Sequence, residues 1–266
     1  MILSDFHVHT CYCDGKDKPE DIVLEAISKG MKKIGFSGHS YVDFDESISW
    51  PADNVEKYKN EIKRLKQKYK SQIKILLGTE YDYFSDVNTD DYDYIIGSVH
   101  YITCGGKKIP IDHTIECFEQ AIKECNGDVY EVCEKYFEIV SDVVNKTNAN
   151  IIGHFDLVSK FNDGSKFFDE DNPRYVKAAE KALDVLLKTG RPFEINTGAM
   201  SRGYKKFPYP SKKILGYIAA HDGSVILSSD SHRKETLMYK FDECEELANS
   251  LGLKLVHQSF FAVAVA

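Results

Sequence analysis

The stretch Asp5-Phe6-His7-Val8-His9-Thr10 directly follows a short apolar run at residues 1–4, which has the composition of a β-strand. Successive side chains of a strand point to opposite faces, so His7 and His9 are expected to point the same way. Two imidazoles on one face can bind one metal ion. Alone, this pair is weak evidence, because a single histidine is more often a surface residue or a satisfied core residue.

Five later apolar runs also lead into potential metal ligands. The runs at 33–37, 73–77, 94–99, 151–153 and 225–229 are followed by His39, Glu80, His100, His154 and the segment Asp230-Ser231-His232. Imidazole nitrogens and carboxylate oxygens are the ligands that zinc and similar divalent ions prefer. Six of the nine histidines of the chain stand at such strand ends. The repeated pattern predicts a metal centre where any one motif would not.

The apolar runs alternate with amphipathic segments that predict helices. The expected helices cover residues 19–29, 55–70, 114–125, 129–147, 174–188, 211–220 and 234–250. Two further strands are expected at 193–196 and 253–256. Strands that alternate with helices indicate parallel strands joined by crossovers. Roughly eight β/α units predict an α/β barrel, with its active site at the C-terminal ends of the strands, where every candidate ligand lies.

The motifs, in order, are D-x-H-x-H, G-H-S, G-T-E, S-V-H, G-H-F-D and S-D-S-H. This order resembles the PHP family (polymerase and histidinol phosphatase), and in particular its stand-alone L-histidinol-phosphate phosphatases. The motifs run from Asp5 to His232, and no polymerase module is present. The resemblance implies a distorted barrel of about seven or eight β/α units. It also implies three divalent metal ions, which could be zinc, manganese or iron. We expect residues 1–266 to form a single domain.

The resemblance also assigns the metal ligands. One metal would take His7, His9, Glu80 and Asp230, a second would share Glu80 and take His100 and His154, and a third would take His39, His232 and Asp14. Many family members have a histidine in place of Asp14. Here the loop reads Thr10-Cys11-Tyr12-Cys13-Asp14-Gly15, and its two cysteines are the alternative ligands. Glu80, Asp230 and His232 are the expected catalytic residues.

Other polar residues are expected outside the metal site. His113 stands in a predicted turn, His221 at a helix end and His257 after the last strand. Asp5 is expected to orient an imidazole and not to bind metal itself. For Asp156, both of these roles remain open.

The expected reaction is attack by metal-bound hydroxide on a small-molecule phosphate monoester. The chain has neither a D-x-D-x-T nor a C-x5-R motif, which would indicate a phosphoenzyme route. The resemblance favours L-histidinol phosphate as the substrate. Candidate substrate-binding residues are Asp43 and Asp45 for a cationic group, Tyr101, and Arg202 for a phosphate oxygen. Equally, the acidic loop could be merely solvated and Arg202 a surface residue.

Two other classes of function stay open at this point. One is a phosphoesterase that acts on phosphotyrosine, nucleotides or DNA ends, and the other is a metal-binding protein without turnover. The chain has a formal net charge of −8, so it lacks the basic surface expected of a nucleic-acid-binding protein. Seven cysteines without a C-x-x-C motif, no signal peptide and no apolar run of about 18 residues predict a cytoplasmic protein without membrane partners. The apolar tail 259–266 is compatible with a strand or a helix.

Overall fold

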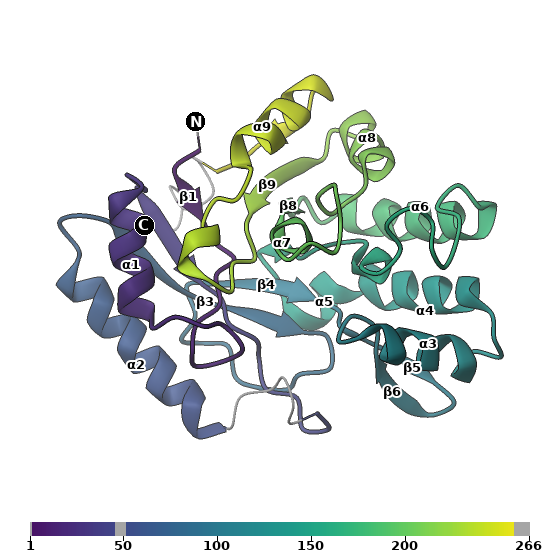
Figure 1. Ribbon diagram of the computed structural model, residues 1–266, viewed down its shortest axis with the longest axis horizontal. Helices are drawn as coiled ribbons and strands as arrows, with labels where there is room; N and C mark the ends of the chain where they lie inside the picture. The colour runs from purple at the N-terminus through teal and green to yellow at the C-terminus, as the bar shows by residue number, and fades with distance from the viewer. Residues whose placement is uncertain (1, 46–51, 258–266) are drawn as a thin grey trace.

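A curled eight-stranded sheet forms the centre of this computed structural model (Figure 1). The strands lie in chain order, and each pairs with its neighbours in parallel. They are β1 (Ser4–Asp5), β2 (Lys33–Phe36), β3 (Lys74–Asp82), β4 (Tyr94–Ser98), β7 (Ile151–Ile152), β8 (Phe193–Asn196), β9 (Ser224–Ser228) and β10 (Lys254–Leu255). The predicted α/β barrel of parallel strands is therefore confirmed, in a distorted and incomplete form.

The structure describes residues 2–45 and 52–257. The apolar tail 259–266 lies outside the described residues. Within them, no helix is both long enough and apolar enough to cross a bilayer.

The barrel closes in an irregular way beside β9. At the start of that strand, Ser224 and Val225 pair with β10. Beyond its end, Ser231 instead forms a parallel bridge with Val8, which follows β1. The backbone N–H of His9 donates to Ser231 O at 2.8 Å, and that of Ser231 donates to His7 O at 3.1 Å. The first and last predicted ligand segments are therefore hydrogen-bonded neighbours.

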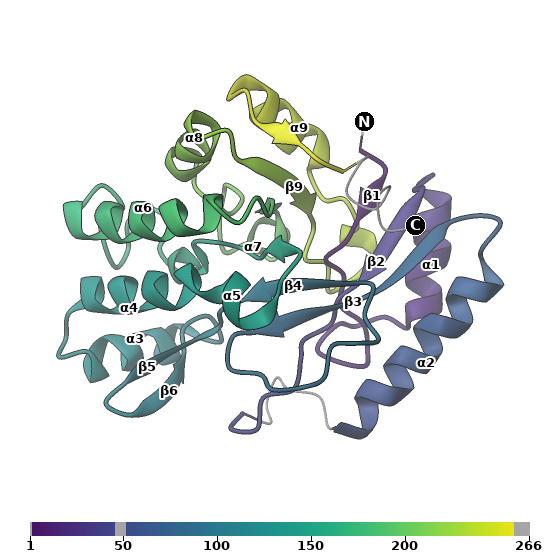
Figure 2. The same ribbon diagram turned by 180° about the vertical axis from the view of Figure 1, so that it is seen from behind.

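Helices cover the outside of the sheet. They are α1 (Pro19–Ser28), α2 (Ala52–Lys68), α3 (Ile115–Glu124), α4 (Val129–Ser141), α5 (Val143–Thr147), α6 (Pro173–Leu187), α7 (Gly198–Ser201), α8 (Lys212–Ala220) and α9 (Phe241–Ser250). In both views α1 and α2 lie at one end of the molecule and α3, α4 and α6 at the other (Figures 1 and 2). On α2 the side chains of Tyr58, Ile62 and Leu65 are fully buried, because this spacing places them on one helix face.

Two of the predicted helices are interrupted. The segment 129–147 divides at Asp142, whose carboxylate accepts a hydrogen bond from the Tyr83 hydroxyl at 2.9 Å. The segment 234–250 begins with a 3-10 turn (Lys234–Thr236), and α9 starts only at Phe241. Between them Met238 and Lys240 have φ values of 56° and 54°. An α-helix requires a negative φ at every residue, so the prediction of one continuous helix is wrong there.

A β-hairpin that was not predicted lies beside the C-terminal rim. Its strands are β5 (Tyr101–Cys104) and β6 (Lys107–Pro110), which pair antiparallel across Gly105-Gly106. Both glycines have positive φ, as a two-residue hairpin turn requires. After the hairpin, Ile111 donates its N–H to His100 O at 3.0 Å. The hairpin therefore returns the chain to the rim at Asp112 and His113.

Candidate metal centre

Glu80 is at the middle of the predicted ligands. Its Oε2 lies 2.9 Å from His39 Nδ1, 3.3 Å from His7 Nε2 and 3.4 Å from His9 Nε2. Its Oε1 lies 2.7 Å from His154 Nε2 and 3.2 Å from His100 Nε2. Each carboxylate oxygen thus faces a different set of imidazoles, as a bridging ligand would.

His7 and His9 share one face of the first segment, as the alternation predicted. Their ring centroids are 5.2 Å apart. Asp230 Oδ1 lies 3.2 Å from His9 Nε2 and 3.8 Å from His7 Nε2. These three side chains form one potential metal-binding group, with Glu80 adjacent. His39, Glu80 and His100 form another.

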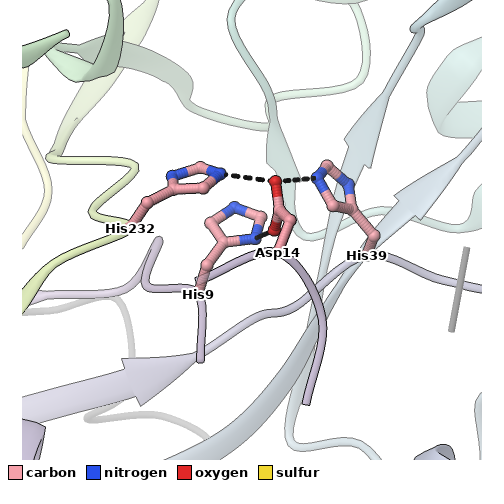
Figure 3. A group of neighbouring side chains, drawn as sticks. All are labelled: His9, Asp14, His39 and His232. Carbon is pink, nitrogen blue, oxygen red and sulfur yellow. Dashed lines mark hydrogen bonds and ion pairs between the residues drawn. The ribbon is translucent and has the colours of Figure 1, made fainter. Parts of the chain in front are cut away.

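Asp14 lies between three imidazoles (Figure 3). Its oxygens are 2.8 Å from His232 Nε2, 3.1 Å from His9 Nδ1 and 3.6 Å from His39 Nε2. A tight turn at Gly15 brings Asp14 back over His9. Only glycine fits this turn without a clash, because a Cβ at residue 15 would lie 2.6 Å from Thr10 N. Cys11 is exposed, and Cys13 Sγ contacts His9 Nδ1 at 3.5 Å from outside this group. The geometry thus favours Asp14 over either thiol.

The cluster contains buried polar atoms that form no hydrogen bond with the described residues. His7 Nε2, His9 Nε2, Glu80 Oε2 and Asp14 Oδ1 are buried and have no hydrogen-bond partner among the described residues. An unsatisfied buried polar atom is costly, and a divalent cation would remove that cost. The ligands are all nitrogen and oxygen atoms, which suit zinc, manganese and iron alike. The residues present therefore fit a metal centre.

Charges within the cluster perturb one another strongly. Burial opposes protonation of His7, but Glu194, Glu80 and Asp230 together raise its pKa to about 10. Burial likewise opposes protonation of His100, yet Glu80 and Asp82 raise its pKa to about 10. Burial would raise the pKa of Glu80, but the surrounding imidazoles hold it well below its usual range. Protons and metal ions therefore compete for these imidazoles.

Two carboxylates that the sequence reading missed orient the ligands from behind. Glu194 Oε1 lies 2.8 Å from His7 Nδ1, and Asp82 Oδ2 lies 3.0 Å from His100 Nδ1. Such carboxylate–imidazole contacts fix which ring nitrogen faces a metal. Two signals in the sequence point to them. Glu194 is the one charged residue in the otherwise uncharged strand 193–196, and Asp82 follows Glu80 on the same strand face.

Asp5 has a different role from the one predicted. Its Oδ1 accepts from the backbone N–H groups of His7 at 3.3 Å and Ser229 at 3.2 Å, and its Oδ2 accepts from Met238 N–H at 3.1 Å. It contacts backbone N–H groups and the side chain of Ser229 and no imidazole among the described residues, so that prediction is wrong. Asp156 accepts from Ser211 N–H at 2.9 Å and is not among the candidate ligand groups of the described residues.

A cavity of about 950 Å³ opens above the cluster. Its floor contains Asp14, His39, Glu80, His100, His154, Asp230 and His232. The rest of the lining includes Asp112, His113, Leu157, Lys160, Tyr204, Lys16, Arg202, Arg233, Glu235 and Thr236. The volume is within the range of small-molecule sites.

Of the predicted substrate-binding residues, the structure brings only Arg202 to the cavity. Arg202 donates from Nη2 to Asp230 Oδ2 and from Nη1 to Asp230 O, both at 3.0 Å. The buried Tyr101 donates its hydroxyl to Asp45 Oδ2 at 2.9 Å, and neither residue lines the cavity. Asp43 is exposed and also lies outside the lining. The loop after His39 packs against the hairpin through Phe44, whose ring meets that of Tyr101 with centroids 4.9 Å apart.

The three excluded histidines differ in their outcome. His113 lines the cavity, because the hairpin carries the turn at 110–113 back to the rim, but it is in none of the candidate metal-binding groups of the described residues. His221 ends α8 and contacts Tyr217 O through Nδ1 at 2.8 Å. His257 is buried with Nε2 3.0 Å from Leu227 N. The last two lie outside the cavity lining, as predicted.

Comparisons with known proteins match the chain to one family. The PHP domain model matches residues 5–198. A probable histidinol-phosphatase of Schizosaccharomyces pombe is 30% identical over 87% of this chain and 80% of its own length. The histidinol-phosphatase of Bacillus subtilis is 27% identical over 91% of this chain and 98% of its own.

Two solved structures have the same fold. A putative histidinol phosphatase from Listeria monocytogenes has a TM-score of 0.78 and 21% identity, covering 90% of this chain and 99% of its own. A histidinol phosphate phosphatase from Lactococcus lactis, complexed with zinc, L-histidinol and phosphate, has a TM-score of 0.74 and 24% identity, covering 95% of each chain. With the family model matching most of the chain and the predicted ligand motifs gathered on one rim, the chain belongs to the PHP domain family.

Proposed function

We propose that this protein is a metal-dependent phosphatase that hydrolyses L-histidinol phosphate to L-histidinol and phosphate. The observation that carries the proposal is Glu80, whose two oxygens face five imidazoles at the floor of a small-molecule cavity. The relatives that share the chain over most of its length and are named histidinol-phosphatases support the choice of substrate.

Three divalent ions, zinc, manganese or iron, would be held by the predicted ligands. His7, His9 and Asp230 would hold one, and His100 and His154 another, with Glu80 shared between them. Asp14, His39 and His232 would hold the third. When bound, such ions activate water and neutralise charge on the phosphoryl oxygens.

The residues of the chain position the phosphoryl group and the attacking water. Arg202 lines the cavity beside Asp230, where its planar guanidinium can donate two hydrogen bonds to a phosphoryl group. Burial would raise the pKa of Asp230, but Arg202 and His7 hold it well below its usual range. Asp230 is therefore an ionised carboxylate at the floor of the cavity, where it would orient the attacking water by accepting a hydrogen bond from it.

The test is a phosphate-release assay with metal content measured on the same sample. L-histidinol phosphate should be hydrolysed with a higher kcat/KM than phosphotyrosine, a nucleoside monophosphate or a DNA 3′-phosphate. No release of phosphate from it by a metal-loaded sample would contradict the proposal.

The stereochemical course tests direct attack by water. A single in-line displacement inverts the configuration at phosphorus, whereas a phosphoenzyme route uses two displacements and retains it. A chiral isotopically labelled ester should therefore give inverted phosphate, and retention would exclude the proposed mechanism.

A further inference from the structure

Two buried thiols outside the metal centre face each other. Cys104 is the last residue of β5, and Cys125 directly follows α3. Their side chains are 5% and 0% exposed, and their Sγ atoms lie 2.6 Å apart. The other five cysteines form no such sulfur–sulfur contact among the described residues. These two thiols are therefore the pair that the fold itself brings together.

The backbone around the pair is held in place without a covalent link. Lys107 Nζ, on β6, donates to Glu124 Oε1, at the end of α3, at 3.1 Å. Phe118 of α3 is buried in the same hydrophobic cluster as both cysteines. A bond between the two sulfurs therefore requires no rearrangement of the hairpin or of the helix.

A metal ion fits this pair less well than a disulfide does. Glu131 of α4 is close enough to complete a group of three potential ligands with Cys104 and Cys125. Two thiolates on one zinc ion lie about 3.8 Å apart, because Zn–S bonds of about 2.3 Å meet at a tetrahedral angle. The two Sγ atoms are much closer than that. In addition, Glu131 Oε1 lies 3.5 Å from Lys135 Nζ, which partly neutralises its charge.

We propose that Cys104 and Cys125 form a reversible disulfide that ties the β5–β6 hairpin to the end of α3. The oxidant is a hydroperoxide, in the simplest case hydrogen peroxide. The Cys104 sulfur attacks one peroxide oxygen and becomes a sulfenic acid, while the other oxygen leaves as water. The Cys125 sulfur then attacks the sulfenic sulfur, so the S–S bond forms as the S–O bond breaks and a second water leaves. In total, two thiols lose two electrons and two protons to one peroxide.

The surroundings of the pair set the order of these steps. Cys104 retains some exposed surface and Cys125 has none, so peroxide reaches Cys104 first. Burial and the neighbouring Cys104 raise the pKa of Cys125 to about 12, so Cys125 is a protonated thiol near pH 7. Such a thiol reacts slowly with a free oxidant. Cys125, however, is held in contact with the one sulfur that it has to attack.

The disulfide would enclose residues 105–124. This segment contains α3 and also Asp112 and His113, which line the cavity. Closing a loop removes conformational freedom from the unfolded chain and so stabilises the folded state. In a reducing compartment the bond would form only during exposure to an oxidant. The pair would thus strengthen the attachment of the hairpin when peroxide is present.

The experiment treats reduced, metal-loaded protein with hydrogen peroxide, blocks the remaining thiols with iodoacetamide and digests the protein with trypsin without reduction. Cys104 is the only cysteine of tryptic peptide 75–107, and Cys125 shares peptide 124–135 with Cys133. These two peptides should be cross-linked, with fragment ions placing the bond at Cys125, and dithiothreitol should separate them. Absence of the cross-link, or a bond from Cys104 to any other cysteine, would overturn the proposal.

Thermal unfolding gives a second readout that does not depend on any enzymatic activity. A disulfide that closes a loop of about 20 residues should raise Tm by roughly 5 to 10 °C, and dithiothreitol should reverse the shift. Cys104→Ser should lack both the cross-link and the shift, whereas Cys117→Ser, within the enclosed segment, should retain both. An equal shift in Cys104→Ser, or the loss of one bound zinc ion from that variant, would count against the disulfide.

Discussion

The Glu80 carboxylate is surrounded by imidazoles, and the residue lies within strand β3. It is almost fully buried at 1% exposure, and β3 continues past it to Asp82. Its position is therefore fixed by backbone pairing on both sides, with β4 and with the residues that follow β2. The proposed bridging role requires this rigidity, because two ions would share its two oxygens.

Replacing Glu80 by Ala should remove metal and lower kcat/KM by at least roughly 100-fold, while the barrel still folds. Metal analysis and circular dichroism on the same sample check this. Glu119→Ala, on the exposed face of α3, is the control and should retain full activity. Near-normal turnover of Glu80→Ala would show that Glu80 is not shared by two ions.

Asp14 should matter more than either neighbouring thiol. It contacts three imidazoles, whereas Cys13 contacts only His9 among the predicted ligands. Asp14→Ala should therefore lower kcat about tenfold or more and remove part of the bound metal, and Cys13→Ser should change both by less than about twofold. The opposite ranking of the two variants would identify Cys13 as the ligand of the loop.

At the scale of elements, His257 links β9 to the end of the described chain. Burial lowers the pKa of this imidazole to about 4, from an ordinary value of 6.5. The unfolded chain therefore takes up a proton below pH 6.5, while the folded chain does so only below about pH 4. Acid favours unfolding across this interval, and the stability contributed by the neutral imidazole is lost as the pH falls from 6.5 to 4.

When the pH falls from 7 to 5, the unfolding free energy of the wild-type protein should therefore decrease by about 2 kcal/mol more than that of His257→Leu. The variant lacks the titrating imidazole. Urea denaturation of both proteins at the two pH values measures the difference. Parallel losses in the two proteins would mean that the pKa of His257 is the same in the folded and unfolded states.

The position of a residue within its strand or loop decided whether its role could be predicted from the sequence. Ligands that directly follow apolar runs, such as His39 and His154, were predictable because a run marks the strand and its end marks the rim. Glu194 was missed because it faces the cluster from within a strand, where a charge normally argues against burial. Asp112 and Lys160 were missed because long-range folding alone brings their two loops together. Only the Gly105-Gly106 pair signalled the hairpin that carries Asp112.

At the scale of the whole molecule, the metal centre joins segments from nearly the full length of the sheet. Its ligands follow β1, β2, β4, β7 and β9 or lie in β3, so ions that bind them hold the curled sheet together. Binding to the folded state alone stabilises it by about 4 kcal/mol at a ligand concentration 1,000 times Kd. Restoring zinc to chelator-treated protein should therefore raise Tm by about 10 °C.

Glu80→Ala provides the control for this melting experiment. Because it lacks the shared ligand, added zinc should raise its Tm much less than that of the wild-type protein. A wild-type Tm that is indifferent to chelator and to zinc would argue that the cluster binds no ion in the folded state.

The bridge between Val8 and Ser231 has a consequence for how the protein is made. His7 and His9 are synthesised before Asp230 and His232, the residues that flank the partner of this bridge. The imidazoles of His7 and His9 cannot contact these partner ligands at first, because the partners are synthesised more than two hundred residues later. A product shortened before β9 lacks both the closing bridge and the last ligands. The proposed set of ions can therefore be bound in full only after the segment that follows β9 has been synthesised.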